Sequence, residues 1–291
     1  MPELPEVETV RRGLERLIIG RKIRGVRVFD SPKSFPNSSA DVNQFLIGAS
    51  VETIRRRAKV LLIDLSTKYT LVTHLKMTGQ VVFISTERFG AGHPNDSLIG
   101  ELPDRSSRVE VTFDDGSHLY FNDQRKFGWM KLYPTLEVPN IDFMKKVGPE
   151  PLEDSFTAGD LIVRLRRRNG TTIKAAILDQ TVLAGVGNIY ADESLWAAKI
   201  HPASRVKDVL DTQLAELLQE IKYVMNLSIE KGGSTDKNYV NAEGKRGSYI
   251  DFARVFRREG KECPRHPGVE IEKIRVAGRG THICPVCQVL A

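Results

Sequence analysis

The chain has 291 residues, enough for one large or two ordinary domains that each bury a core. Its 43 basic and 37 acidic side chains give a formal charge of +6 and a pI of about 9.2, a modest excess that suits a polyanionic partner. No run approaches the roughly 18 apolar residues of a membrane span, and the first residues lack the pattern of a secretory signal. These features argue against membrane and secreted classes, and we expect a soluble, cytoplasmic protein with no membrane partner.

The first half of the chain predicts an antiparallel β-sandwich with a helix laid on it. Apolar residues recur at helical spacing from Pro5 to Ile18, which predicts an amphipathic helix almost at the chain end. Strand-like runs follow at 59–66, 69–77, 80–85 and 108–123. Asp115-Gly116 supplies a hairpin turn within the last of them.

The second half predicts helices. A segment rich in proline, glycine and charge at 145–155 marks a domain boundary, and beyond it the apolar period changes from two to 3.6. Helical patterns cover 158–168, 172–180, 188–199 and 207–231. The polar, glycine-rich residues 231–249 predict a mobile loop.

All three cysteines fall in the last 29 residues, which argues for metal binding rather than a disulfide framework. Two short-spaced pairs, C-P-R-H at 263–266 and C-P-V-C at 284–287, can close a tetrahedral zinc site. The predicted ligands are Cys263, His266, Cys284 and Cys287. Between the pairs, two strand-like runs joined by a turn at 277–280 predict a hairpin whose folding depends on the metal. An unmetallated tail is the alternative.

Several basic and polar residues stand where they could contact a phosphate, although each also has an ordinary structural explanation. Arg279 is flanked by Gly278 and Gly280 at the tip of the predicted hairpin, but it could simply be solvated. Asn188 follows the glycine-bearing turn at 184–187 and would cap the next helix, a common arrangement in any protein. Lys59 precedes an apolar strand and Lys174 stands near a helix start, and both could be solvated charges.

The segment NDQRKFGWM at 122–130 follows a strand and places Phe127 directly after Arg125 and Lys126 in a predicted turn closed by Gly128. A phenylalanine there could wedge between base pairs while Arg125 and Lys126 hold phosphates. The sequence by itself leaves open whether Phe127 is such a wedge or a core residue.

The chain begins MPELPEVE. Removal of Met1 would leave Pro2 with a secondary amine whose pKa, roughly 7.7–8.0 for an α-amino group, leaves a neutral fraction at pH 7. Such an amine can attack an electrophilic sugar carbon, and a neighbouring acid such as Glu3 could protonate the departing group. A helix start explains Pro5, Glu6 and Glu8 equally well, but it does not explain Pro2 and Glu3.

Six motifs in order along the chain, MPELPEVETVRRGL, HLKMTG, QRKFG, DQTVLAGVGNIYADESLW, GGST and GRGTHICPVCQ, closely resemble those of bacterial formamidopyrimidine-DNA glycosylases, which repair 8-oxoguanine. The resemblance spans nearly the whole chain. It implies an α+β fold with an N-terminal antiparallel β-sandwich domain at 1–147, a helix–two-turn–helix DNA-binding domain at 148–250 and a zinc-finger β-hairpin at 251–291. One structural Zn²⁺ and damaged double-stranded DNA are the expected cofactor and partner, and the protein is expected to be a monomer.

The resemblance also implies the chemistry. Pro2 is expected to attack C1′ of the damaged nucleoside and form a Schiff base, after which β and δ eliminations cut the strand. Glu3 would act as the acid, Glu6 would help organise the site, and Lys59 would contact the damaged base and a phosphate. The expected contacts to phosphates and to the gap left by the extruded base are made by His74, Met77, Arg125, Phe127, Lys174, Asn188 and Arg279, and residues 231–249 would cap the lesion.

The first metal pair departs from the family pattern. The family ordinarily has Cys-x-x-Cys there, whereas this chain has His266 in place of the second cysteine and an additional Pro267 before Gly268. A Cys3His site is chemically reasonable.

Three other functions compete with this interpretation. One is a sister glycosylase of the endonuclease VIII type that removes oxidised pyrimidines. The residues that argue against it are Leu4, Pro5, Met77, Arg125 and Phe127. The others are a zinc-bearing DNA binder that does not cut, and an RNA-binding ribosome-associated protein. A pure binder has no use for an amine at the chain end.

Overall fold

The computed structural model describes residues 2–93, 95–234 and 249–291. Two compact units divide the chain, one formed by 1–145 with 231–248 and the other by 146–230 with 249–291. Of the lesion-capping loop expected at 231–249, residues 235–248 lie outside the described part of the chain.

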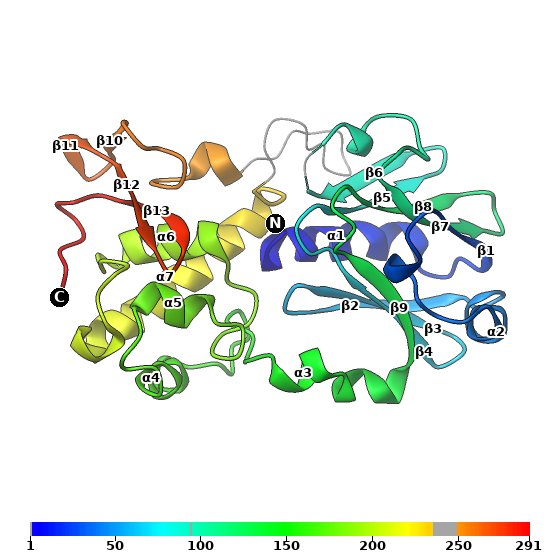
Figure 1. Cartoon of the computed structure of the whole chain (residues 1–291), viewed down its shortest axis with the longest axis horizontal. Helices are drawn as coiled ribbons and strands as arrows, with labels where there is room; N and C mark the ends of the chain where they lie inside the picture. The colour runs from blue at the N-terminus through cyan, green and yellow to red at the C-terminus, as the bar shows by residue number, and fades with distance from the viewer. Residues whose placement is uncertain (1, 94, 235–248) are drawn as a thin grey trace. The chain divides into compact units, whose positions relative to one another are not determined.

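The first unit contains two antiparallel sheets (Figure 1). In order across the five-stranded sheet lie β1 (Ile23–Val28), β7 (Ser107–Phe113), β8 (His118–Asp123), β5 (Gly79–Ile84) and β6 (Arg88–Gly92). In order across the four-stranded sheet lie β2 (Val51–Arg57), β3 (Val60–Leu65), β4 (Tyr69–His74) and β9 (Trp129–Pro134). Short helices occupy the connections, namely η1 (Pro32–Ser34), α2 (Ser39–Asp41), η2 (Val42–Leu46), η3 (Asp96–Leu98), η4 (Thr135–Asn140) and α3 (Asp142–Lys146).

Helix α1 (Leu4–Ile18) runs between the two sheets and contacts strands of both (Figure 1). Its apolar stripe, Val7, Val10, Leu14 and Ile18, belongs to one core cluster with residues from the two inner sheet faces. Gly13 lies directly against the ring of Phe89 on β6, where a Cβ atom would meet the ring at 2.1 Å. The helix is therefore a central layer of the sandwich, which fixes the position of its first turn.

The second unit is helical. It contains α4 (Ala158–Arg166), α5 (Ile173–Leu178), α6 (Asn188–Ala197) and the long α7 (Asp211–Glu230), with η5 (Val206–Asp208) and η6 (Tyr249–Phe252) in the connections. Thr157 and Thr172 cap α4 and α5 by accepting bonds from the backbone three residues on. Two small hairpins follow, β10 (Glu262–Cys263) with β11 (His266–Glu270), and β12 (Glu272–Val276) with β13 (Arg279–Ile283).

The predicted α+β class, sandwich, helical domain and hairpin are confirmed. Strands β1, β2 and β6 were not predicted, because their apolar residues are few or interrupted by arginine and glycine. Strand β9 was not predicted either, although its sequence, WMKLYP, contains neither of these residues. Among the described residues, no helix is long and apolar enough to cross a membrane.

Candidate active site and nucleic-acid interface

The first turn of α1 brings Pro2, Glu3 and Glu6 together. Glu3 is the N-cap residue, and its backbone N–H donates to Glu6 Oε2 at 2.7 Å in a capping box. Both carboxylates are buried, at 3% and 5% exposure, and Pro2 is buried beside them. The helix start therefore holds both acidic side chains in buried positions.

Glu6 has a second role at the opposite side of its carboxylate. Its Oε1 accepts a hydrogen bond from the backbone N–H of Ser234 at 2.7 Å, within the GGST motif. Gly233 adopts a φ of +95°, and a Cβ there would approach Glu6 Cγ to 3.3 Å. The Glu6 carboxylate therefore joins the first turn of α1 to the backbone at Ser234.

Lys59 lies in the tight turn between β2 and β3 and is only 6% exposed. The preceding residue, Ala58, adopts a φ of +52°, and its carbonyl accepts a bond from Arg56 Nη1 at 3.0 Å. Arg56 Nε also donates to Glu8 Oε2 on α1 at 3.0 Å. The turn carrying Lys59 is consequently fixed to the same helix that carries the acids.

His74 ends β4 and is 7% exposed. Burial lowers its pKa from 6.5 to about 3, with the positive charges of Lys76 and Lys59 adding to the effect. The backbone N–H of Lys76 donates to Nδ1 at 3.0 Å, so the neutral ring carries its proton on Nε2. His74 can therefore donate one hydrogen bond to a phosphate without being charged.

A buried aspartate organises the turn that carries Arg125 and Phe127. Asp123 accepts from the Thr78 hydroxyl with one oxygen and from the Gly128 N–H, at 2.6 Å, with the other. Thr78 in turn accepts the Arg125 N–H at 3.0 Å, so the turn is joined to the residue that follows Met77. These hydrogen bonds hold the turn that carries Arg125 and Phe127, two of the predicted void-filling residues.

Phe127 is a surface residue rather than a core residue, because 54% of it is exposed. The Arg125 guanidinium lies over its ring at 4.8 Å. This placement resolves the alternative that the sequence left open in favour of a side chain available to a partner.

Lys174, in the second unit, is completely buried. Its Nζ lies 2.5 Å from Asp192 Oδ1 on α6 and 2.7 Å from Thr281 Oγ1 on β13. The other oxygen of Asp192 accepts from the His282 backbone N–H and faces His282 Nδ1, both at 3.0 Å. The ammonium group joins α5, α6 and the hairpin, and it is not exposed for contact with a phosphate.

Asn188 does not cap α6, contrary to the sequence-based expectation. The N-cap is Gly187, without a side-chain cap bond, and Asn188 is the first helical residue. Its Nδ2 instead donates to the Gly280 carbonyl at 3.0 Å, next to the exposed Arg279. The amide is used to hold the hairpin turn, in which Ala277 and Gly278 have positive φ angles of 52° and 71°.

The four predicted metal ligands converge, with their donor atoms all within 4.8 Å of one another. Cys263 Sγ and Cys287 Sγ are 3.8 Å apart, and His266 Nδ1 lies 3.1 Å from Cys287 Sγ and 3.8 Å from Cys284 Sγ. Two sulfurs bound to one Zn²⁺ at about 2.3 Å in a tetrahedron would be about 3.8 Å apart. The cluster therefore fits one structural Zn²⁺ with Cys3His ligation.

The pKa values of two of these thiols are shifted in opposite directions. Although burial opposes ionisation, hydrogen bonds led by the Arg265 N–H lower the pKa of Cys263, whereas burial and the neighbouring thiols raise that of Cys287. A divalent cation stabilises all three thiolates at once.

Sequence reasoning identified these side chains but missed Asp123, Thr78 and Asp192, which position them. Asp123 stands at the strand end just before QRKFG, where an aspartate that satisfies turn N–H groups is common. Asp192 has no comparable local signature, because its partners are distant in sequence.

Three family models match the chain. The formamidopyrimidine-DNA glycosylase N-terminal domain covers residues 1–130, the H2TH domain of the same enzymes covers 147–239, and a zinc finger found in FPG and IleRS covers 260–289. Formamidopyrimidine-DNA glycosylases of Herpetosiphon aurantiacus and Pediococcus pentosaceus are each 43% identical, covering 99% and 100% of this chain and 100% of their own lengths. The structure of a complex between Lactococcus lactis Fpg and abasic-site DNA has a TM-score of 0.86 at 34% identity, with 99% of both chains covered.

Fold, metal cluster and matches together define a class: a zinc-bearing DNA glycosylase with a helix–two-turn–helix unit. Within that class, the chain belongs to the formamidopyrimidine-DNA glycosylase family.

Proposed function

We propose that this protein removes oxidised purines from double-stranded DNA and cuts the strand, with Pro2 as the nucleophile. The observation that carries the proposal is the pair of buried carboxylates fixed by the first turn of α1 beside Pro2. It presumes removal of Met1, which lies outside the described residues. Family membership supports the reaction class, and the chain-end geometry supports the assignment of roles.

In the proposed reaction, the Pro2 nitrogen forms a bond to C1′ while the bond from C1′ to the base nitrogen breaks, and the base leaves with the proton that the amine gives up. Glu3 protonates the ring oxygen, so the sugar opens to an iminium. The iminium acidifies C2′–H, and removal of that proton expels the 3′ phosphate. Removal of the C4′ proton in a second elimination expels the 5′ phosphate. Glu6 keeps Glu3 and the helix start in place through its bond to Glu3 N–H.

On this proposal, Lys59, His74, Asn188 and Arg279 hold the damaged strand, and Met77, Arg125 and Phe127 fill the gap left by the extruded nucleotide. Lys174 has a positioning role, because its buried bonds to Asp192 and Thr281 fix the strand that begins at Arg279. We infer a monomer, because none of the proposed roles needs a second copy, and a cytoplasmic location, because the proposed substrate is DNA.

The Pro2→Gly variant tests the nucleophile. Glycine keeps a primary α-amine but loses the secondary amine and the fixed ring, so we expect cleavage of an 8-oxoguanine duplex to fall at least about 100-fold while binding changes only a few-fold. Single-turnover cleavage and fluorescence anisotropy measure the two quantities. Normal cleavage by Pro2→Gly would remove Pro2 from the mechanism.

The substrate class is tested with the unaltered protein. Borohydride trapping on a duplex with 8-oxoguanine opposite cytosine is expected to give a covalent adduct, more than an oxidised-pyrimidine duplex gives. Preferential trapping on the pyrimidine would move the protein to the sister activity, and no adduct on either would indicate a DNA binder that does not cut.

A further inference from the structure

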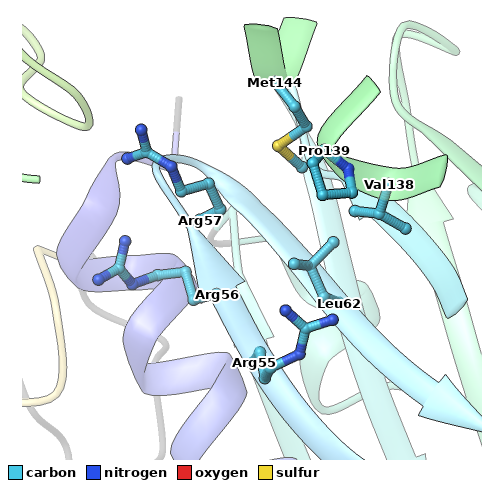
Figure 2. Close-up of a pocket in the computed structure, with 7 residues that line it drawn as sticks. All are labelled: Arg55, Arg56, Arg57, Leu62, Val138, Pro139 and Met144. Carbon is cyan, nitrogen blue, oxygen red and sulfur yellow. The ribbon is translucent and has the colours of Figure 1, made fainter. Parts of the chain in front are cut away.

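Three consecutive arginines on β2, Arg55, Arg56 and Arg57, line a pocket of about 290 Å³ in the first unit (Figure 2). The remaining lining residues are apolar, namely Leu62 on β3, Val138 and Pro139 on η4, and Met144 on α3. The pocket therefore combines a cationic side with an apolar wall, and none of the roles assigned above accounts for it.

The strand register explains how the arginines are presented. Successive positions alternate between the faces of a strand, so Arg55 and Arg57 occupy outer-face positions. The Arg57 side chain itself extends past the end of the strand toward the start of α1 (Figure 2). Arg56 points to the opposite face, toward α1, where it binds Glu8 (Figure 2). Arg55 extends toward Leu62, and Asp64 holds it through two hydrogen bonds of 2.5 and 2.8 Å. Arg55 thus forms a fixed, charge-compensated part of the wall.

Arg57 lies in the same cross-strand row as His74. In the register of the four-stranded sheet, Arg57 pairs with Val60, and Val60 pairs with His74. Neighbouring strands are about 4.8 Å apart, which places the Arg57 and His74 backbones roughly 10 Å from each other. This row ends the sheet at the turn that carries Lys59, so one edge of the unit presents Arg57, Lys59 and His74.

The chemistry of this edge favours a phosphodiester. The positive charges of Lys59 and Lys76 both help to lower the pKa of His74, so two ammonium groups act on this edge. A guanidinium fork matches phosphate oxygens, and Leu62, Pro139 and Met144 offer an apolar surface to a sugar but no donors for reading a base.

We propose that Arg57 and the pocket beside it bind the DNA backbone phosphate next to the one that His74 contacts, with the deoxyribose against the apolar wall. This inference rests on the proposed function, because it requires the edge with Lys59 and His74 to face DNA. It assigns a sequence-independent contact that extends the footprint along one strand.

The test compares Arg57→Gln with Arg24→Gln, a matched change at an exposed arginine of β1 in the other sheet. Binding to a duplex with a tetrahydrofuran abasic analogue is measured by anisotropy over a series of salt concentrations. We expect Arg57→Gln to weaken binding several-fold at low salt and to reduce the slope of log K against log salt by roughly 0.9, while Arg24→Gln matches the wild type. An unchanged slope for a folded Arg57→Gln variant would overturn the proposal.

Neutral methylphosphonates, placed one at a time in the duplex, locate the contact. At one flanking position, the methylphosphonate should lower the affinity of the wild type but should not lower that of Arg57→Gln any further. The absence of such a position would contradict the assignment. If Arg57→Gln does not fold, Arg57→Lys replaces it, with the salt slope kept and affinity reduced about threefold because the planar fork is lost. Affinity equal to wild type in that variant would also overturn the proposal.

Inorganic phosphate distinguishes a small-anion site from a backbone site. Thermal stabilisation of wild type but not of Arg57→Gln by phosphate, combined with unchanged DNA binding, would assign the pocket to a free anion and reject a DNA contact. Binding to the tetrahydrofuran duplex does not require strand cleavage, so it tests the Arg57 contact separately from the proposed reaction. Failure of the proposed function would instead appear as a lack of borohydride adduct from the wild type.

Discussion

Pro2 and Arg279 are each presented at the end of a short element, but different forces hold the two elements. The helix behind Pro2 is a layer of the sandwich, with Leu4, Val10 and Leu14 completely buried. The hairpin behind Arg279 has a small apolar cluster, to which the cysteines themselves belong, and is joined to α6 by the contacts of His282 with the buried Asp192 and by Asn188. Hydrophobic packing therefore positions the proposed nucleophile, whereas the metal cluster and buried charges position the proposed phosphate contact.

Zinc removal should separate the two regions most strongly. Metal binding contributes about 10–16 kcal/mol in zinc-finger peptides, far more than this hairpin's core can supply. We expect chelation to lower DNA affinity at least about 100-fold and to release hydrogen-exchange protection in 262–288, while the strands of the sandwich keep theirs.

His266→Cys is the control for that experiment, because it restores a four-cysteine site and should retain zinc and affinity. Undiminished DNA binding by zinc-free protein would mean that the hairpin does not depend on the metal.

Lys174→Met should give the next largest effect. It leaves Asp192 buried beside His282 without its ammonium partner, and breaking a buried pair costs about 3–5 kcal/mol. We expect that loss in the free energy of unfolding of the second unit, measured by denaturant titration, together with weaker DNA binding.

The double variant Lys174→Met/Asp192→Leu should recover part of the stability, since no lone charge remains. The exposed pair Lys68–Glu52 provides a control, and its removal should cost less than about 0.5 kcal/mol. A cost as small for Lys174→Met would contradict the positioning role.

His74 gives the smallest effect, and it belongs to the packed region. Its folded pKa of about 3 lies below the unfolded value of 6.5, so between these values the unfolded chain binds more protons. Its stabilising contribution is complete above pH 6.5 and is lost as the pH falls toward 3, amounting to about 2 kcal/mol between pH 7 and pH 5.

His74→Asn keeps an acceptor near the Nδ1 position and removes the titration. The stability difference between wild type and His74→Asn should therefore shrink by that amount over this interval, as measured by denaturant titration at each pH. Parallel pH profiles for the two proteins would show that His74 is not held neutral by burial.

The sequence predicted features that depend on local patterns and missed those that depend on contacts between distant residues. The α1 period, the hairpin at 108–123 and the cysteine spacing are local patterns, and the structure contains each of them. The Lys174–Asp192 pair joins residues 18 positions apart with a strand more than 100 residues away, so no local pattern predicts that Lys174 is buried. Asn188 likewise sits at a plausible cap position, but a tertiary bond to Gly280 takes its side chain.

Mapping the borohydride-trapped adduct tests the central claim most directly. Wild-type protein trapped on an 8-oxoguanine duplex is digested, and tandem mass spectrometry locates the sugar remnant. The account predicts the remnant on the nitrogen of Pro2, in a peptide that lacks Met1. A remnant on Lys59, the buried amine in the β2–β3 turn, would contradict it and make the lysine the nucleophile.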